Sequence, residues 1–154
     1  MRIGGSLIGG VLLVAATSSA AADLEGPGRY CGYSAIIDLE AGETVTTQSG
    51  GMHGGTFVWS GSFGTLQVRN IGWAKRPEGM RVRRLTATGQ TRFSARKRDG
   101  KYEIAIWNRR YGAAYFQSDE RFTESQFAAI DRVHLYDEWG KPEGCRLRTV
   151  RVTG

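Results

Sequence analysis

The sequence is poor in the residues on which many catalytic sites depend. It contains only two histidines, His53 and His134, and they belong to no HxH, HxxxH or HExxH pattern. This disfavours a zinc-dependent hydrolase, because a zinc site needs several ligands at suitable spacing. No GxSxG motif is present either, which disfavours an esterase with its serine on a strand-to-helix turn. We therefore assign no catalytic residue, no metal ligand and no cofactor from the sequence.

Long apolar runs are also missing after the first 22 residues, so no later segment is expected to cross a membrane. The first 22 residues differ from the rest. A positively charged start precedes an uncharged, largely apolar stretch over 3–16, and small residues over 17–22 end in an Ala-Ala-Ala cleavage pattern. This order is typical of a secretory signal peptide. We predict that residues 1–22 are such a signal, that the mature chain begins near Asp23, and that the protein is periplasmic or extracellular.

Cysteine is scarce, with Cys31 near the start of the mature chain and Cys145 near its end. In an oxidising compartment, a single pair of cysteines is best explained by a disulfide. Neither belongs to a CxxC motif, and two free buried thiols are the alternative. Closing a loop of this length is expected to contribute about 4–5 kcal/mol in the chain-entropy model. We predict one β-rich domain over residues 23–154, closed by a Cys31–Cys145 disulfide.

Acidic residues are sparse in the middle third of the chain, where the positive charge gathers. Residues 69–110 carry thirteen basic and three acidic side chains, a net charge of +10, whereas residues 23–68 carry −4 and residues 111–154 carry −1. The basic side chains of the middle third are Arg69, Lys75, Arg76, Arg81, Arg83, Arg84, Arg92, Arg96, Lys97, Arg98, Lys101, Arg109 and Arg110. Most are arginine, whose planar fork matches carboxylate and phosphate oxygens. The pattern favours a basic face that binds a polyanion, and a solvated surface without a partner is the alternative.

The rest of the mature chain has the pattern of a mainly β protein. Short aromatic and β-branched runs alternate with glycine-containing turns, which predicts about seven to eight short antiparallel strands in a single small domain. A sandwich or a barrel-like meander fits this count. Asp99-Gly100 is the clearest turn signal, because this dipeptide favours a tight hairpin.

Alternation along the strands around this hairpin predicts which side chains face the core. The expected inward side chains are Tyr102, Ile104 and Ile106 of the strand over 101–107, together with Phe93 and Ala95 of the strand before it. The expected outward side chains are Trp107, Arg92, Arg96 and Arg98, beside Arg81 and Arg83. A basic sheet face with an exposed tryptophan follows from this register.

One helix start stands out near residues 124–132. Thr123 and Gln126 have the spacing of a capping box, in which each residue bonds the backbone of the other. Phe122 and Phe127 have the spacing of a hydrophobic staple at the same end. Because the two signals agree, we predict one short helix there.

These patterns favour a binding or structural module over an enzyme. The candidate binding residues are Arg81, Arg83, Arg96, Arg98, Arg109, Arg110 and Trp107. Rings that stand beside guanidinium groups can stack on sugars or bases and pair with phosphates. The expected partner is an anionic macromolecule such as an envelope glycan, a lipid phosphate, a nucleic acid or an acidic protein.

Two other functions remain open at this stage. One is an inhibitor-like, protein-binding module, whose marker would be an ordered, protruding loop, with residues 49–56 and 74–80 as the candidates. A small secreted hydrolase is a further alternative, which would use acidic residues or the glycine-bedded loop around His53. A deep cleft with converging polar groups would favour the hydrolase.

Overall fold

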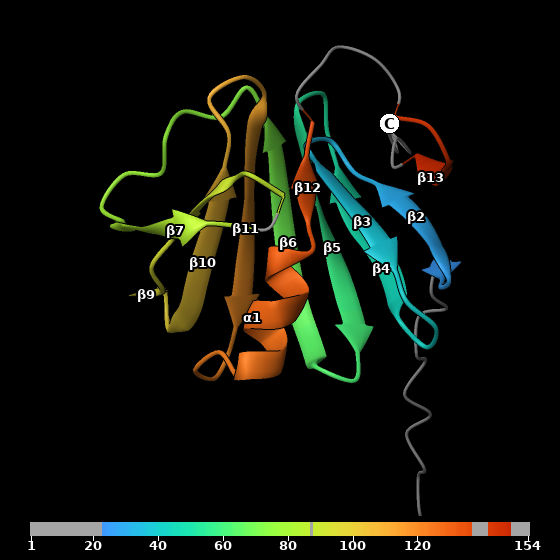
Figure 1. The fold of residues 1–154 in the computed structure, drawn as a ribbon, viewed down its shortest axis with the longest axis horizontal. Coiled ribbons are helices and arrows are strands. Elements are labelled where there is room, and N and C mark those ends of the chain that lie inside the picture. The colour runs from blue at the N-terminus through green and yellow to red at the C-terminus, as the bar shows by residue number, and fades with distance from the viewer. Residues whose placement is uncertain (1–22, 87, 137–141, 149–154) are drawn as a thin grey trace, which may run out of the picture.

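The computed structural model describes residues 23–86, 88–136 and 142–148 (Figure 1). This part of the chain is mainly β with one short helix, as the sequence predicts. The predicted signal peptide over 1–22 lies outside the described residues. Within them, no helix has the length and apolar character that crossing a membrane requires.

The strands form two sheets (Figure 1). The larger sheet has the order β1 (Leu24–Glu25), β4 (Thr44–Gly50), β5 (Gly54–Gly61), β6 (Gly64–Gly72), β11 (Gly112–Ser118), β10 (Lys101–Trp107), β8 (Thr91–Phe93) and β7 (Val82–Leu85), and β9 (Arg96–Arg98) also pairs with β10. The smaller sheet has the order β12 (His134–Leu135), β3 (Ala35–Leu39), β2 (Gly28–Cys31) and β13 (Cys145–Arg148). The helix, α1, spans Glu124–Asp131. The strands are more numerous and shorter than the pattern suggests, because several predicted strands are divided, as β8 and β9 are by Ser94 and Ala95.

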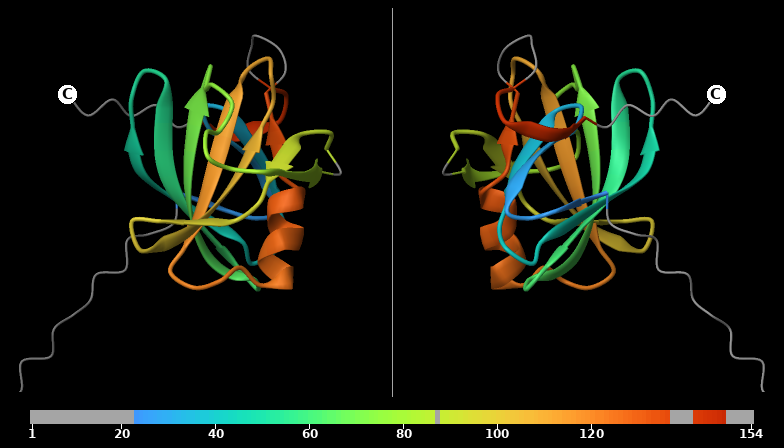
Figure 2. Two further views of the ribbon diagram at one scale, coloured as in Figure 1. Left: turned by 90° about the vertical axis from the view of Figure 1, so that its left-hand side faces the viewer. Right: turned by 90° about the vertical axis from the view of Figure 1, so that its right-hand side faces the viewer.

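The main core lies between the larger sheet on one side and α1 with the smaller sheet on the other. Figure 1 shows α1 and β12 in front of β6 and β11, and both views of Figure 2 place α1 and the β4–β5 hairpin on opposite sides. Ile104 and Ile106 of β10 are fully buried in this core, as the alternation predicts. Trp59 of β5 and Ile130 of α1 pack in the same cluster. The core therefore draws on both sheets and the helix.

Helix α1 begins where the sequence predicts. The Thr123 side chain accepts a hydrogen bond from the Gln126 backbone N–H at 3.2 Å, and the Gln126 side chain accepts one from the Thr123 backbone at 3.0 Å. The Phe122 and Phe127 rings are in contact, with centroids 5.9 Å apart. The two hydrogen bonds satisfy backbone donors at the start of the helix that would otherwise be unpaired, and the ring contact packs the preceding residue against the first turn.

The two sheets are also joined by buried polar side chains. The Asn70 side-chain oxygen of β6 accepts hydrogen bonds from the backbone N–H groups of Tyr33 and Ser34, and its amide donates to the Gly55 carbonyl at 2.9 Å. The Ser34 hydroxyl donates to the Ala113 carbonyl at 2.7 Å. Because Asn70 and Ser34 are both buried, each unmade bond would leave a polar group without water. These bonds hold the turn between β2 and β3 against the larger sheet.

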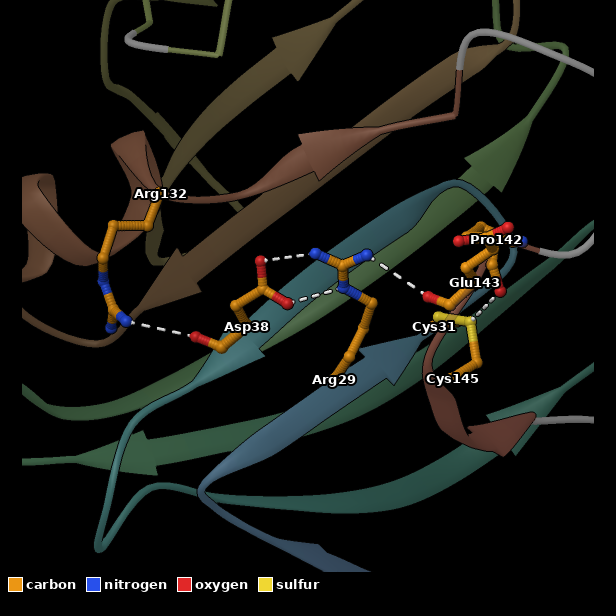
Figure 3. Close-up of polar contacts among 7 residues, drawn as sticks. All are labelled: Arg29, Cys31, Asp38, Arg132, Pro142, Glu143 and Cys145. Carbon is orange, nitrogen blue, oxygen red and sulfur yellow. Dashed lines mark hydrogen bonds and ion pairs between the residues drawn. A yellow bond between two sulfur atoms is a disulfide. The ribbon is translucent and has the colours of Figure 1, made fainter.

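The two ends of the described chain meet at β2 and β13, which run parallel to one another. Figure 3 shows the disulfide that joins Cys31 to Cys145, as the sequence predicts, across a sequence separation of 114. Beside it, Arg29 forms two bonds with the Asp38 carboxylate, at 2.6 and 2.9 Å, and a third with the Glu143 carbonyl at 3.2 Å. Arg29 therefore connects β2 to β3 and to the segment that precedes β13.

The Arg29–Asp38 pair gives a prediction about pH. Hydrogen bonds from Arg29 are the main reason why the pKa of Asp38 is lowered from its usual value. A lowered pKa in the folded state means that the pair stabilises the fold above the unfolded-state pKa of Asp38. That contribution is lost as the pH falls through the lower, folded-state pKa. We expect an NMR titration of the Asp38 carboxyl to show the lowered pKa, and Arg29→Gln to raise it.

The size of this effect is limited by solvent. Both side chains are more than one-third exposed, so the pair should stabilise the fold by at most about 1 kcal/mol. An Asp38 pKa that stays the same in Arg29→Gln would show that the bidentate contact does not persist in solution.

Candidate anion-binding site

The positive charge of the chain gathers in one part of the structure, which we call the basic lobe. It comprises residues 74–101, that is, the segment before β7, the strands β7, β8 and β9 with their connections, and the first residue of β10. It carries ten basic and two acidic side chains, a net charge of +8. The lobe lies at the β7 end of the larger sheet, and both views in Figure 2 place β7 next to α1.

The predicted binding residues do not all lie together. Arg81, Arg83 and Arg98 are exposed in the basic lobe, whereas Arg109 and Arg110 are exposed in the turn between β10 and β11. Arg98 pairs with Lys101 at the start of β10, so it lies about 20 Å along this seven-residue strand from the turn arginines. Strands β7 and β8 lie beside the other end of β10, where Arg92 stands opposite Ile106. Arg98 and the turn arginines therefore do not form one continuous site.

Arg96 has a partner within the fold. Its guanidinium bonds one oxygen of the Glu103 carboxylate at 2.8 and 3.2 Å, and it also donates to the Glu78 carbonyl at 2.7 Å. Glu103 is fully buried, and its other oxygen accepts a bond from Gln117 at 2.9 Å and lies 3.8 Å from Arg69. Removing Arg96 would leave this carboxylate short of a counter-charge. Arg96 is therefore a structural residue first.

Trp107 lies on the outer face of the sheet, but it is not an open platform. The segment before β7 crosses this face, and the indole Nε1 donates to the Ala74 carbonyl at 3.0 Å. Trp107 packs against a second apolar cluster that includes Met80, Phe93 and Ala105. The expectation of an exposed tryptophan is therefore wrong in detail, because a loop that sequence alternation does not reveal covers the face.

The predicted orientation of Arg92 and Phe93 is also reversed. Arg92 stands opposite Ile106 in the ladder between β8 and β10, so it shares the face that packs against α1. It is only 8% exposed, and its Nη1 lies 3.0 Å from an Asp131 oxygen of α1. Phe93 is buried on the other face, and Ala95 is exposed, not inward. Both faces of β8 are covered by other parts of the chain. The position of the apolar side chain of Phe93 therefore does not show which face of β8 packs against the main core.

Arg92 lines a surface cavity between β7–β8 and α1, which we call the arginine cavity. Its volume is about 430 Å³. The lining residues are Arg83, Arg84, Arg92, Phe93, Ser94, Ala95, Glu124 and Phe127. The other oxygen of Asp131 accepts a hydrogen bond from Arg84, so one carboxylate bridges two guanidinium groups. The cavity thus brings three arginines together.

The charge balance of this cavity favours an anion. Burial is the main reason why the pKa of Arg92 is lowered, and the nearby charges of Arg84 and Arg83 lower it further, whereas Glu124 raises it. With Asp131, these five side chains carry a net charge of +1. A bound negative group would offset the repulsion among the guanidinium groups.

The aromatic rings around the lobe are covered by cations. The guanidinium carbon of Arg92 lies 5.0 Å from the centre of the Phe127 ring, and that of Arg76 lies 5.8 Å from the Phe93 ring. The Lys97 ammonium lies 5.6 Å from the Tyr102 ring. Contacts of this kind stabilise the charge over the ring face. The lobe therefore presents positive charge to a ligand. The ring faces that contact these cations are not open for a ligand to stack on.

A row of rings lies outside the lobe, where the loop around His53 meets the end of β6. His53, Trp73, Tyr111 and Tyr136 follow one another, with centroid distances of 5.1, 5.4 and 5.2 Å. Trp73 has a positive φ of 54° and is 47% exposed. The left-handed region is costly for such a residue, so the surrounding backbone must hold it there. At the start of this row, the glycine-rich loop places the His53 ring against the ring of Trp73.

The sequence pattern does not indicate Arg84 and Arg92 of the arginine cavity, or Asp131, which binds both of them. Arg84 and Arg92 belong to the basic segment but appear in no motif, and Asp131 looks like an ordinary helical acid. The predicted helix is the one signal in the sequence that could have found this contact. Asp131 lies at the end of that helix, and its carboxylate would need a basic partner if the helix packed against the arginine-rich strands. Among the described residues, no group of three or more His, Cys, Asp or Glu side chains could hold a metal ion.

The site therefore offers positive charge and guanidinium hydrogen-bond donors, the groups that suit an anion. No known protein-family model, curated protein or solved structure matches the chain, so this geometry is the basis for assigning a function.

Proposed function

We propose that the protein is an exported binding module that holds an anionic polymer against its basic lobe. The observation that carries the proposal is the concentration of a net charge of +8 in residues 74–101. Much of this charge is accessible, since Arg81, Arg83, Lys97 and Arg98 are all exposed. Such a patch attracts polyanions by releasing their counterions. The signal-like segment over 1–22 and the disulfide support an exported location.

The partner that fits best is an anionic polysaccharide. Binding of single-stranded nucleic acid relies on aromatic rings that stack on successive bases. In the lobe Phe93 is buried, and beside the lobe cations cover the rings of Phe127 and Tyr102. What the lobe offers is arginine and lysine, which pair with sulfate, phosphate or carboxylate groups of a glycan. Duplex nucleic acid, which is bound through its phosphates, serves as the competing ligand in the test.

Charge reversal of the lobe tests the proposal. We expect Lys97→Glu with Arg98→Glu to elute from immobilised heparin at much lower salt than the unmodified protein. The slope of log binding constant against log salt should fall by about 2, because two contacts are lost. The matched control is Arg109→Glu with Arg110→Glu, which makes the same change in net charge at the far end of β10. The control should keep nearly the full slope.

Three outcomes would contradict the proposal. The first is an unmodified protein that heparin does not retain at low salt. The second is an equal loss in both variants, which would mean that net charge alone governs retention. The third is a stronger interaction with duplex DNA than with heparin at matched charge, which would show that the partner is a nucleic acid and not a polysaccharide.

A further inference from the structure

We propose that the arginine cavity is a seat for one singly charged oxyanion ester, either a sulfate ester or a phosphodiester group. Arg83, Arg84 and Arg92 would donate hydrogen bonds to its oxygens. The inference rests on the proposed function for the origin of the group, which would be one unit of the anionic polymer. It goes beyond that function because it names one pocket and one ligand chemistry within a broad basic surface.

The first step of the argument is the hydrogen bonding of Arg92. A guanidinium has five N–H donors and no acceptor. Among the described residues, Asp131 is the only hydrogen-bond acceptor for Arg92, and it engages one nitrogen. The Arg92 side chain is 10% exposed, so water reaches little of it. None of its nitrogens is both fully buried and unpaired, so its remaining donors reach solvent, and the side chain lines the cavity, where a ligand could accept from them.

The second step is that the Asp131 carboxylate has little capacity left to accept further hydrogen bonds from the arginines. One of its oxygens accepts from Arg92 and the other from Arg84. Arg84 is about half exposed and Arg83 is exposed, so both can adjust to a ligand in the cavity. Glu124 also lines the cavity, but within the described chain no hydrogen bond joins it to the three guanidinium groups, so a ligand can supply them with a further acceptor.

The third step concerns the charge and shape of the ligand. The cavity groups and Asp131 together carry +1, so a single negative charge neutralises them. Sulfate esters and phosphodiesters carry one negative charge and several oxygens, which suits donors that approach from three side chains. Phe93, Ala95 and Phe127 supply apolar walls that suit the carbon side of an ester. The Ser94 hydroxyl adds a donor that lines the same cavity.

A comparison with another cavity supports this choice. The cavity lined by Asp38, Glu40, Arg132 and His134 also contains charged groups. There, however, Arg132 lies 2.9 Å from a Glu40 oxygen, and Asp38 is held by Arg29. Those carboxylates already have cationic partners. The arginine cavity is different because its guanidinium groups outnumber the nearby carboxylates.

The test uses the full mature chain and two small probes, methyl sulfate and dimethyl phosphate. Each is titrated at constant ionic strength, with sodium chloride as the control, while NMR follows the Nε–H signal of Arg92. We expect a saturable shift for at least one probe, and the stronger probe identifies the ester. Arg83→Gln should weaken that binding by about tenfold, because one charged donor is lost. Arg109→Gln, which removes the same charge at a residue that does not line the cavity, should leave it unchanged.

The outcomes separate this inference from the proposed function. Heparin retention without a saturable shift from either probe would overturn the arginine cavity and leave the basic lobe as the binding surface. Equal weakening in Arg83→Gln and Arg109→Gln would also overturn it. A saturable shift without heparin retention would support anion binding in the arginine cavity and overturn the proposal that the ligand is a polymer. Arg92→Gln should abolish the saturable binding, and Arg83→Gln, an exposed change, keeps the test valid if Arg92→Gln fails to fold.

Discussion

Replacing both cysteines, Cys31→Ala with Cys145→Ala, is expected to lower the free energy of unfolding by about 4–5 kcal/mol. The bond joins residues with a sequence separation of 114, so it closes a very long loop in the unfolded chain. It also holds β13 against β2, a parallel pair whose partners come from the two ends of the described chain. Urea unfolding of the variant and of the unmodified protein gives the difference.

Two further measurements check this result. Reduction of the unmodified protein should destabilise it by the same amount as the double replacement. The denatured, non-reduced protein should contain no titratable thiol. A loss below about 1 kcal/mol would mean that the cross-link adds little to an already constrained unfolded state. Two titratable thiols would show that the disulfide does not form.

Glu103→Leu is expected to destabilise the domain by about 3–5 kcal/mol, the cost of removing one partner from a buried ion pair. The carboxylate is fully buried and receives bonds from Arg96 and Gln117. Without it, Arg96 keeps only the Glu78 carbonyl, and Gln117 loses its acceptor. The segment that covers Trp107 should loosen as a result. Equilibrium unfolding measures the loss, and hydrogen exchange locates it.

A double-mutant cycle with Arg96→Leu isolates the pair. We expect the double variant to be less destabilised than the sum of the two single variants, by about 1–3 kcal/mol, because neither charge is then left alone. Glu120→Leu, at an exposed acid, is the matched control and should change stability by less than about 0.5 kcal/mol. Additive losses would mean that the charges of Glu103 and Arg96 do not stabilise one another.

The features that sequence predicts well here are those with local causes. Thr123 and Gln126 cap α1 through contacts that span only three residues, so the pattern contains all the information needed. The Asp99-Gly100 turn joins β9 to β10 as expected, with both residues at positive φ. Ile104 and Ile106 face the core because β10 is central and its alternation is unambiguous.

The features that sequence misses depend on what covers a face. Alternation assigns one buried and one solvated face to a strand, but β8 packs against α1 on one side and the segment before β7 on the other. Arg92 can be buried because Asp131 of α1 meets it, a contact between residues 39 positions apart. For the same reason, the basic segment predicts a positively charged region but not which arginines share a cavity.

The disulfide has one more consequence, which concerns the covalent shape of the molecule. The chain between Cys31 and Cys145 is a closed ring, and the ring includes the entire basic lobe, the arginine cavity and α1. A single protease cut at an exposed arginine or lysine of the lobe would open this ring without releasing a fragment. The two pieces would stay covalently joined through Cys31 and Cys145. A cut in the surface proposed for binding would therefore leave every part of the molecule attached.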